Sequence, residues 1–392
     1  MAIQPYSPVA VFGNDAENPP RVMVAPQRYV QGPGVIHRVG HYMHSLMKVR
    51  RAAVLASKRG HASQGAQLID SLKSSHIESV NAEFHGECSL QEIEAQVKAL
   101  EQDKPDCVVA VGGGKLVDAG KSIAYRLGVP VVIVPTLASN DAPCSALSVI
   151  YTPKGISDDV EYFPQNPALV VVDTEVVANA SERYLVAGMG DAMATWYEAK
   201  VCLENPQARN MLGARPTLAS CAMGETCAHA LYQHGEAASA AVIERRTNDA
   251  LEQVVEANTL LSGIGFESGG LAVAHAMALA LTEIDVVHHN YLHGEMVAMG
   301  LMAQLSLDKG NEARKVGEFL ARVGLPVNLD QISLSLQRAD DIDTIVEATL
   351  ANPLAHNMSE PLRRESLRQA VSSAHELGQQ ITAEMGDQAY RR

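Results

Sequence analysis

Short apolar runs rich in β-branched residues alternate with helical patterns through the first 180 residues of the chain. Runs of this kind are typical of strands that are buried on both faces. The strands that we expect are residues 21–25, 52–56, 108–111, 131–134 and 169–172. Strands that alternate with helices indicate βαβ units and a mostly parallel sheet.

After residue 173 the residue pattern changes, and long helical patterns rich in Ala, Leu and Met replace the β-branched runs. The helical segments that we expect include 191–202, 217–232, 244–261, 271–281 and 295–307. The chain of 392 residues is too long for one ordinary core. We therefore expect an α/β domain over residues 1–180, of which residues 1–20 form a loose arm, and an all-helical domain over 181–392. A ligand site is expected in the cleft between them.

Composition narrows the class of protein. Apolar residues make up 47% of the chain and charged residues 19%, which is typical of a globular protein. The formal net charge of −14 argues against nucleic acid or an anionic membrane as partner. The six cysteines form no CxxC pair, and there is neither a signal peptide nor an apolar run long enough to span a membrane. We expect a cytoplasmic protein with reduced thiols.

The strand expected at 108–111 ends in three glycines, and a helical pattern begins at Lys115. A lysine in the first turn of a helix opposes the helix dipole unless a phosphate binds to the free N–H groups there. Three glycines alone fit a plain tight turn equally well, and they do not match the GxGxxG fingerprint. The buried strand and the lysine together favour the phosphate of a nucleotide.

The strand expected at 131–134 leads into a loop that is rich in hydroxyl and amide groups. Its polar residues are Thr136, Ser139, Asn140, Asp141 and Ser145. In open α/β sheets, ligands bind beyond the carboxyl ends of the strands, which is where this loop must lie. Such groups suit the recognition of ribose and amides, although they also cap turns in many proteins.

A carboxylate and several histidines in the second half suggest a metal site. Asp191 is expected at the start of a helix, where its ordinary role is that of an N-cap. His275, His288, His289 and His293 lie close together further along the chain. One carboxylate and two imidazoles suit Zn²⁺ with a position left for substrate, and they also suit Fe²⁺. His289 and His293 could form a helical pair, but we prefer His275 with His293 because residues 290–292 read as the lead-in to a helix.

Four stretches together carry a family resemblance. They are Gly-Gly-Gly-Lys at 112–115 with Asp118 and Lys121, the loop and strand at 135–151, Gly-Met-Gly-Asp-Ala-Met-Ala-Thr-Trp-Tyr-Glu-Ala at 188–199, and Gly-Phe-Glu-Ser-Gly-Gly-Leu-Ala-Val-Ala-His at 265–275. These motifs closely resemble glycerol dehydrogenases, the zinc-dependent branch of the iron-containing alcohol dehydrogenase superfamily, which is related in fold to dehydroquinate synthase. The resemblance runs from about residue 20 to the C-terminus. It implies that residues 1–180 bind a dinucleotide, that residues 181–392 bind a metal ion, and that the protein is a homo-oligomer.

The resemblance also implies roles for individual residues. The metal ligands would be Asp191, His275 and His293, and Asp141 would face the substrate, with His289 as a nearby proton acceptor. The cofactor-binding residues would be Gly113, Gly114, Lys115, Asp118, Thr136, Ser139, Ser145, Leu147 and Tyr151. The implied reaction transfers hydride between a nicotinamide dinucleotide and a small alcohol or polyol, with the metal as Lewis acid on the substrate oxygen.

Two positions depart from the family pattern. The first follows the strand at 52–56, where the family usually has an acidic residue for the adenosine ribose and this chain has Ser57, Lys58 and Arg59. Serine beside two cations would accept a 2′-phosphate, so we expect use of NADP, with or without NAD. A solvated, charged helix start is the plainer interpretation of the same residues.

The second departure follows His275. Ala278 and Leu279 stand where the family commonly has a His-Asn pair facing the pocket. An apolar pocket recognises the extra hydroxyls of a triol less well than a pocket that can form hydrogen bonds to them. A less polar alcohol, a diol, or a 2-hydroxy acid whose 2-oxo form is reduced with NADPH are therefore all open as substrates.

Two other classes of function compete with a dehydrogenase. A lyase similar to dehydroquinate synthase would need a cluster of Lys and Arg for a phosphate-bearing substrate, and the loop at 136–151 has none. A dinucleotide-binding scaffold without catalysis would not need the intact set of Asp191, His275 and His293. Both rank below the dehydrogenase.

Overall fold

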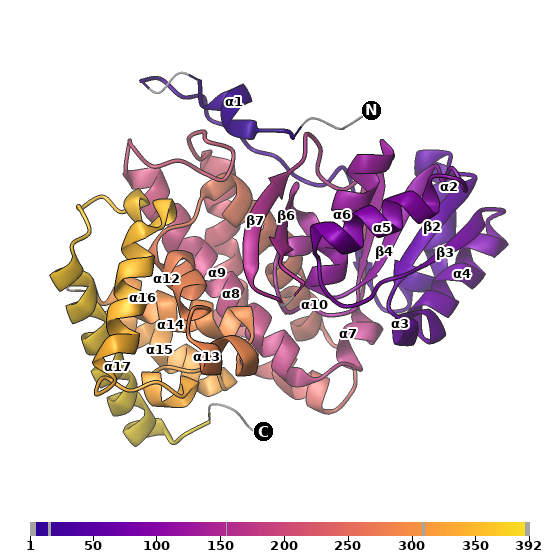
Figure 1. Ribbon diagram of the computed structural model, residues 1–392. Helices are drawn as coiled ribbons and strands as arrows, with labels where there is room; N and C mark the ends of the chain where they lie inside the picture. The colour runs from indigo at the N-terminus through magenta and orange to yellow at the C-terminus, as the bar shows by residue number, and fades with distance from the viewer. Residues whose placement is uncertain (1–4, 15–16, 154, 308–309, 389–392) are drawn as a thin grey trace.

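A parallel sheet forms the centre of the first half of the molecule (Figure 1). The computed structural model describes residues 5–14, 17–153, 155–307 and 310–388. Within these residues the sheet has 6 strands, in the order β1 (Tyr29–Gly32), β8 (Leu169–Asp173), β5 (Val131–Pro135), β4 (Cys107–Gly112), β2 (Arg51–Ala56) and β3 (Glu78–Glu83). Every pair of neighbouring strands is parallel. The predicted α/β fold with a mostly parallel sheet is confirmed.

Helices cover both faces of this sheet because its strands are apolar on both faces. Along β2, Val54 packs on the side of α2 and α4, whereas Leu55 packs on the side of α5 and α6. The helices of this half are α2 (Val39–Met47), α3 (Lys58–Ala62), α4 (Gln64–Ser74), α5 (Leu90–Leu100) and α6 (Gly114–Leu127). Burial on both faces is what the β-branched runs predict for a parallel sheet.

A small antiparallel hairpin, which the sequence analysis did not predict, lies beside α6 (Figure 1). Its strands are β6 (Leu147–Tyr151) and β7 (Ser157–Tyr162). The hairpin follows directly on the loop that leaves β5. The polar loop predicted to bind the cofactor is therefore anchored at one end by the central sheet and at the other end by the hairpin.

The strand predicted at residues 21–25 is wrong. Only a single bridge between Arg21 and Arg215 forms there, and the amide of Val24 donates instead to the side chain of Ser268 (2.9 Å). Prolines on both sides of this run prevent a continuous ladder. The segment therefore runs along the helical half, and β1 takes the edge of the sheet beside β8.

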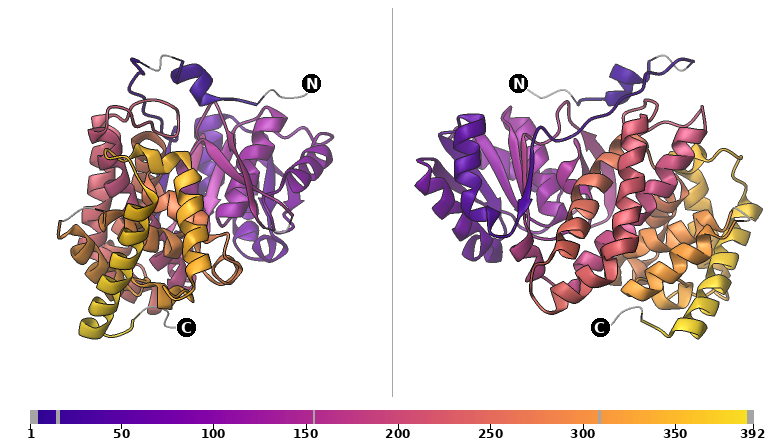
Figure 2. Two further views of the ribbon diagram at one scale, coloured as in Figure 1. Left: turned by 60° about the vertical axis from the view of Figure 1, so that its left-hand side comes forward. Right: turned by 180° about the vertical axis from the view of Figure 1, so that it is seen from behind.

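The second half consists of helices joined by loops in its described residues, as predicted, and lies beside the α/β half in each view (Figures 1 and 2). Its α-helices are α7 (Thr174–Ala178), α8 (Glu182–Glu204), α9 (Leu218–Ile243), α10 (Asp249–Glu256), α11 (Ser262–Ile264), α12 (Val273–Leu281), α13 (Asp285–Asn290), α14 (His293–Leu305), α15 (Glu312–Val323), α16 (Ala339–Ala351) and α17 (Arg364–Met385). A short α1 (Pro8–Phe12) precedes the sheet. All six cysteines are free thiols and buried.

No single helix in the described ranges is both long enough and apolar enough to cross a membrane. One sharply bent pair, 249–269 with 273–281, meets those criteria of length and composition only when its two parts are taken together.

Candidate metal and cofactor site

Asp191, His275 and His293 come together in the helical half. One ligand atom from each residue lies within 4.8 Å of the other two. His275 Nε2 is 3.2 Å from Asp191 Oδ1, and His293 Nε2 is 3.5 Å from the same oxygen. Within the described residues this is the one cluster of three or more His, Cys, Asp or Glu side chains with such a spacing. The three residues that we preferred from the sequence are thus neighbours in space.

Asp191 lies in the interior of α8, so the prediction that it starts a helix is wrong. The sequence Gly188-Met-Gly190 reads as a helix break, but both glycines are helical. They are needed for close approach: a Cβ at Gly188 would overlap the carbonyl oxygen of Ala138, and one at Gly190 would overlap that of Gly294. These two glycines let the β5 loop and the start of α14 reach the turn of α8 that carries Asp191.

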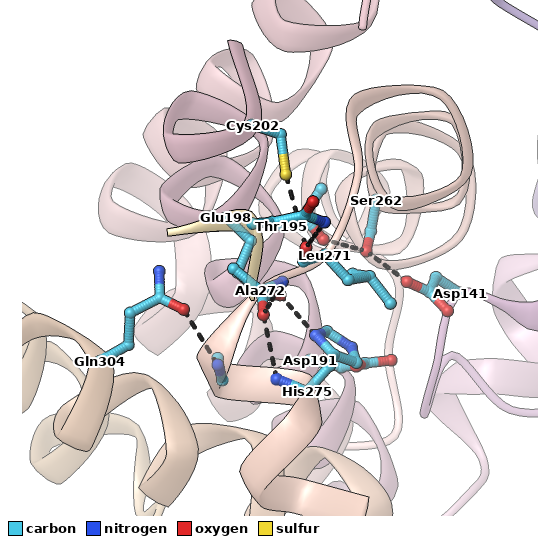
Figure 3. A network of polar contacts seen from close by, with 12 residues as sticks. Asp141, Asp191, Thr195, Glu198, Cys202, Ser262, Leu271, Ala272, His275 and Gln304 are labelled. Atoms are coloured by element: carbon cyan, nitrogen blue, oxygen red, sulfur yellow. Dashed lines mark hydrogen bonds and ion pairs between the residues drawn. The ribbon is translucent and has the colours of Figure 1, made fainter. Parts of the chain in front are cut away.

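Glu198, which the sequence analysis missed, orients His275. Nδ1 of His275 lies 2.5 Å from Glu198 Oε2, and the backbone amides of Ala272 and His275 donate to Glu198 Oε1 (2.7 and 3.0 Å; Figure 3). When Nδ1 donates its proton to Glu198, Nε2 presents its lone pair toward Asp191. The signal in the sequence was a carboxylate seven residues after Asp191, which places both side chains on one face of α8.

A second ion pair holds the turn before His293. Arg183 Nε donates to Glu295 Oε1 (2.7 Å), and the buried carboxylate of Glu295 also accepts from the amide of Leu292 (2.7 Å). His293 is the first residue of α14, so this capping contact fixes the direction in which its ring leaves the helix. His289, in contrast, is exposed on α13 with Nδ1 on the carbonyl of Asp285 (2.8 Å), outside the cluster.

The donor set fits a divalent metal ion. Asp191 is 1% exposed, yet its buried Oδ2 has no hydrogen-bond partner among the described residues. A buried carboxylate oxygen without a donor is costly, and a cation beside it would remove that cost. Two imidazoles and one carboxylate leave further coordination positions open, as a catalytic site requires.

Burial and neighbouring charges shift the pKa values of the site. Burial opposes protonation of His275, but the carboxylates of Glu198 and Asp191 outweigh it and raise the pKa of His275 well above its ordinary value. For Asp141, burial and then the negative charge of Asp191 raise the carboxyl pKa well above its usual range. Neighbouring carboxylates thus favour the charged form of His275, whereas burial and a like charge disfavour the charged form of Asp141. Groups with pKa values shifted in this way are typical of functional sites.

Asp141 lies at the end of the β5 loop and faces the helical half. Its Oδ2 accepts a hydrogen bond of 3.0 Å from Ser262 Oγ, which lies 2.8 Å from Thr195 Oγ1 (Figure 3). The negative charge of Asp191 contributes to the raised pKa of Asp141, whereas the histidines and, last, the backbone of Asp141 favour the charged form of Asp191 and lower its pKa against the effect of burial. Ser262 and Thr195 gave no signal in the sequence because their roles depend on a contact between distant segments.

The glycine turn is built as the sequence suggests, but its lysine has a protein partner. Gly113 is the N-cap of α6 and Gly114 its first residue. Lys115 Nζ lies 2.7 Å from Oε1 of Glu87 and 5.3 Å from the ring centroid of Tyr151. The sequence analysis missed Glu87, which comes from the loop after β3.

Asp118 and Ser145 form buried contacts with Lys121. Lys121 Nζ lies 2.9 Å from Asp118 Oδ1 and donates to Ser145 Oγ (3.2 Å) and to the carbonyl of Ala142 (3.0 Å). The amide of Val149 donates to Asp118 Oδ2 (3.1 Å). These contacts hold the β5 loop and the hairpin against α6. Asp118 and Ser145 therefore stabilise the position of the β5 loop.

Other predicted cofactor residues lie along the same edge of the sheet. Thr136 and Ser139 are half-buried in the β5 loop, and no hydrogen bond of their hydroxyls is described. Leu147 and Tyr151 are the two ends of β6. Together with Gly113 they follow the carboxyl ends of β4 and β5, where ligands of open parallel sheets bind.

Ser57, Lys58 and Arg59 follow the carboxyl end of β2, the strand beside β4. Ser57 Oγ accepts from the amide of Gly60 (3.1 Å) as the N-cap of α3, which is the plainer interpretation of that serine. Lys58 and Arg59 are exposed, with no ion pair among the described residues. They remain able to bind an anion at this end of the sheet.

Ala278 and Leu279 lie on α12 one turn after His275. Ala278 is buried and Leu279 half-buried. An apolar surface thus follows the metal cluster along this helix.

The chain is similar in sequence to known oxidoreductases. A family model described as "Iron-containing alcohol dehydrogenase" matches residues 26–174. A glycerol dehydrogenase of Thermotoga maritima is 42% identical over 358 residues, 91% of this chain and 97% of that protein. A glycolaldehyde reductase of Halobacterium salinarum is 36% identical over 363 residues, 92% of this chain and 98% of that protein.

The fold is similar as well. The crystal structure of glycerol dehydrogenase from Schizosaccharomyces pombe superposes with a TM-score of 0.88 at 32% identity, covering 93% of this chain and 93% of that chain.

Proposed function

Because this chain belongs to the iron-containing alcohol dehydrogenase family, we propose that Asp191, His275 and His293 hold the metal ion of its reaction. The protein is a metal-dependent oxidoreductase that transfers hydride between a nicotinamide dinucleotide and a small alcohol or polyol. One observation supports the ligand assignment above all. The three residues offer donor atoms within 4.8 Å of one another, and the second oxygen of Asp191 is buried with no described hydrogen-bond partner.

The residues of the chain divide the work of the reaction. When bound, the ion supplies Lewis acidity to the substrate oxygen and the dinucleotide supplies the hydride acceptor. Glu198 holds the ring of His275 in one orientation, and Asp141 would accept a hydrogen bond from a substrate hydroxyl. His289, which is exposed on α13, would take up the substrate proton through water. The helices around the cluster bury Asp191 and His275, whereas the side chain of His293 is 42% exposed.

We propose Zn²⁺ as the ion, because two imidazoles and one carboxylate with an open position are the usual set of catalytic zinc. Fe²⁺ accepts the same ligands. Elemental analysis of the purified protein, followed by reconstitution of the stripped protein with each ion, tests the choice. Removal of His275 or His293 by Ala should abolish binding of either ion.

The dinucleotide is proposed to lie along the carboxyl ends of β2, β4 and β5, in the domain of residues 1–180. Gly113, Gly114 and Lys115 would bind the pyrophosphate through backbone N–H groups and one cation. Thr136, Ser139, Leu147 and Tyr151 would line the remainder of its path, with Asp118 and Ser145 holding the loop in place. Residues 181–392 would supply the metal ion.

We propose that this chain accepts NADP. Lys58 and Arg59 are exposed cations without a described partner at the end of β2, and residues 57–59 include no carboxylate that would repel a 2′-phosphate. The double variant Lys58→Ala/Arg59→Ala should raise KM for NADP about tenfold or more and leave KM for NAD nearly unchanged. A strong preference of the wild-type enzyme for NAD would refute the proposal.

The substrate is proposed to be less polar than glycerol. Ala278 and Leu279 offer no hydrogen bonds one turn from His275. A panel of glycerol, 1,2-propanediol, simple alcohols, glycolaldehyde and 2-oxo acids, assayed with both cofactors, tests this. If glycerol has a kcat/KM orders of magnitude above all others, the proposal is wrong. If none reacts with the metal-loaded protein, a scaffold or a lyase replaces the dehydrogenase.

We also propose a homo-oligomer. Leu218 is 73% exposed and Ile243 is 56% exposed, and these two residues are the first and the last of α9. A contact with a second copy of the chain would remove both side chains from water. Light scattering at several protein concentrations gives the oligomeric state directly.

A further inference from the structure

Three polar side chains on one face of α8 each contact a different part of the candidate site. Asp191, Thr195 and Glu198 are spaced at i, i+4 and i+7, and all three are at most 1% exposed. Asp191 is the proposed ligand, and Glu198 holds His275. Thr195 contacts Ser262, which in turn donates to Asp141 (Figure 3). One helix thus touches the metal cluster, its histidine and the substrate-facing loop.

The direction of the hydroxyl chain follows from its chemistry. The Ser262 hydroxyl donates its one proton to Asp141 Oδ2 (3.0 Å). The Ser262 oxygen must then accept from Thr195, at 2.8 Å. Both hydroxyls are fully buried. No described side chain continues the chain beyond Thr195, so it orients Asp141 and does not lead protons to solvent.

The backbone around Ser262 is shaped for these contacts. α11 lies between two π-helical segments, 257–261 and 265–269, and such segments often occur at functional sites. A Cβ at Gly263 would lie 2.9 Å from the Cβ of Cys144, on the β5 loop. A Cβ at Gly265 would overlap the methyl group of Thr195. The two glycines that follow Ser262 therefore let this part of the chain touch both the β5 loop and α8.

We propose that Thr195 and Ser262 are positioning residues that fix the Asp141 carboxylate relative to the metal ligands on α8. The proposal rests on the proposed function, since Asp141 is taken to bind the substrate hydroxyl. A carboxylate held by a buried donor has one orientation, and a substrate that binds to it meets no further ordering cost. Loss of the hydrogen bonds of Thr195 and Ser262 leaves the Asp141 carboxylate free to turn. Substrate affinity then falls, while the metal and dinucleotide sites remain.

The experiment compares four variants of the metal-loaded enzyme. Thr195→Val removes the hydroxyl and keeps the shape, and Ser262→Ala removes the other hydroxyl. Thr195→Ser restores a hydroxyl on the first position without the methyl group. The double variant Thr195→Val/Ser262→Ala tests whether the two act as one unit. Ser220→Ala, which removes a buried hydroxyl of α9 outside the site, is the matched control.

We expect Thr195→Val and Ser262→Ala each to raise KM for 1,2-propanediol about tenfold with a smaller change in kcat. The double variant should lose no more than Ser262→Ala alone, and Thr195→Ser should be close to wild type. Zn²⁺ affinity, measured by competition with a chelator, and NADP affinity, measured by calorimetry, should remain at wild-type values. The control should keep its KM whatever happens to its melting temperature.

Two results would overturn the proposal. One is an unchanged KM in Thr195→Val and Ser262→Ala, which would make the chain a contribution to folding stability only. The other is a Thr195→Ser variant as impaired as Thr195→Val, which would assign the effect to the methyl group. A wild-type enzyme that oxidises no alcohol with either cofactor would instead refute the proposed function, so the two failures are distinguishable.

Discussion

Lys115 Nζ lies 2.7 Å from Glu87 Oε1, so the lysine expected to neutralise a phosphate already has a carboxylate beside it. Lys115 is 47% exposed and Glu87 29% exposed, and the other oxygen of Glu87 has no described partner. A partly exposed ion pair contributes at most about 1 kcal/mol. The pair is therefore weak enough for a bound pyrophosphate to compete for the lysine.

Replacement of Glu87 should strengthen dinucleotide binding. Glu87→Gln removes a negative charge beside the glycine turn and releases Lys115 for the phosphate. Affinity for NAD and for NADP should rise by the same factor, about two- to fivefold. Titration calorimetry with each dinucleotide measures it, with the exposed Glu101→Gln as control. Weaker binding would mean that Glu87 orders the lysine for its ligand.

Glu198 should control metal affinity without being a ligand. Glu198→Gln weakens the acceptor for His275 Nδ1, which lies 2.5 Å from Oε2 in the wild-type protein. Loss of such an outer partner typically lowers metal affinity 10- to 100-fold, and we expect a loss of that order for Zn²⁺. Chelator competition on the protein without dinucleotide gives the value. Glu204→Gln, at the exposed end of the same helix, should bind Zn²⁺ as wild type does.

Gly190 should tolerate no side chain. In Gly190→Ala the new methyl group would overlap the carbonyl oxygen of Gly294 and push the start of α14, with His293, away from Asp191. We expect a loss of about 2–4 kcal/mol of unfolding free energy and a clear loss of Zn²⁺ binding. Chemical denaturation and metal titration measure the two effects. Gly224→Ala in α9, where the added atom meets nothing nearer than 3.4 Å, should be neutral or slightly stabilising.

Glu267 should make stability depend on pH. Burial raises the pKa of this carboxyl to about 7, although the amides of Ala146 and Asn166 donate to it. The folded state then binds a proton that the unfolded state releases near 4.5, so stability is lost as the pH rises between these values.

Glu267→Gln should remove that dependence. Relative to wild type, the variant should gain about 3 kcal/mol of unfolding free energy between pH 4.5 and pH 8. Urea denaturation across this range gives the difference between the two proteins. A constant difference would show that the carboxyl titrates alike in the folded and unfolded states.

Local patterns were sufficient for the elements whose burial is uniform. The runs that became β2, β4, β5 and β8 are apolar on both faces, so their identity as strands does not depend on a particular partner. The same reasoning failed at residues 21–25, where flanking prolines and contacts with the helical half decide the conformation. It also failed at β1, whose sequence Tyr-Val-Gln-Gly carries little strand signal.

Some residues of the site could be predicted from the sequence, and others could not. Asp191, His275 and His293 could be found because few residue types bind metals and they lie in distinctive stretches. The position of Asp191 within its helix could not be predicted from the sequence. Gly188 and Gly190 look like a helix break unless the close approach of Ala138 and Gly294 is known. Glu87, Ser262 and Thr195 act through contacts across more than 25 residues, and a single sequence holds no trace of such pairs.

The pairing of β1 with β8 has a consequence for how the protein is made. β1 is the first strand of the sheet to be synthesised and β8 the last, and β1 is bonded to no other strand. On the ribosome, residues 29–32 must therefore wait until residue 173 has emerged before they can join the sheet. A nascent chain stalled before that point would keep this edge strand unpaired and should be more sensitive to proteases there than one stalled beyond it.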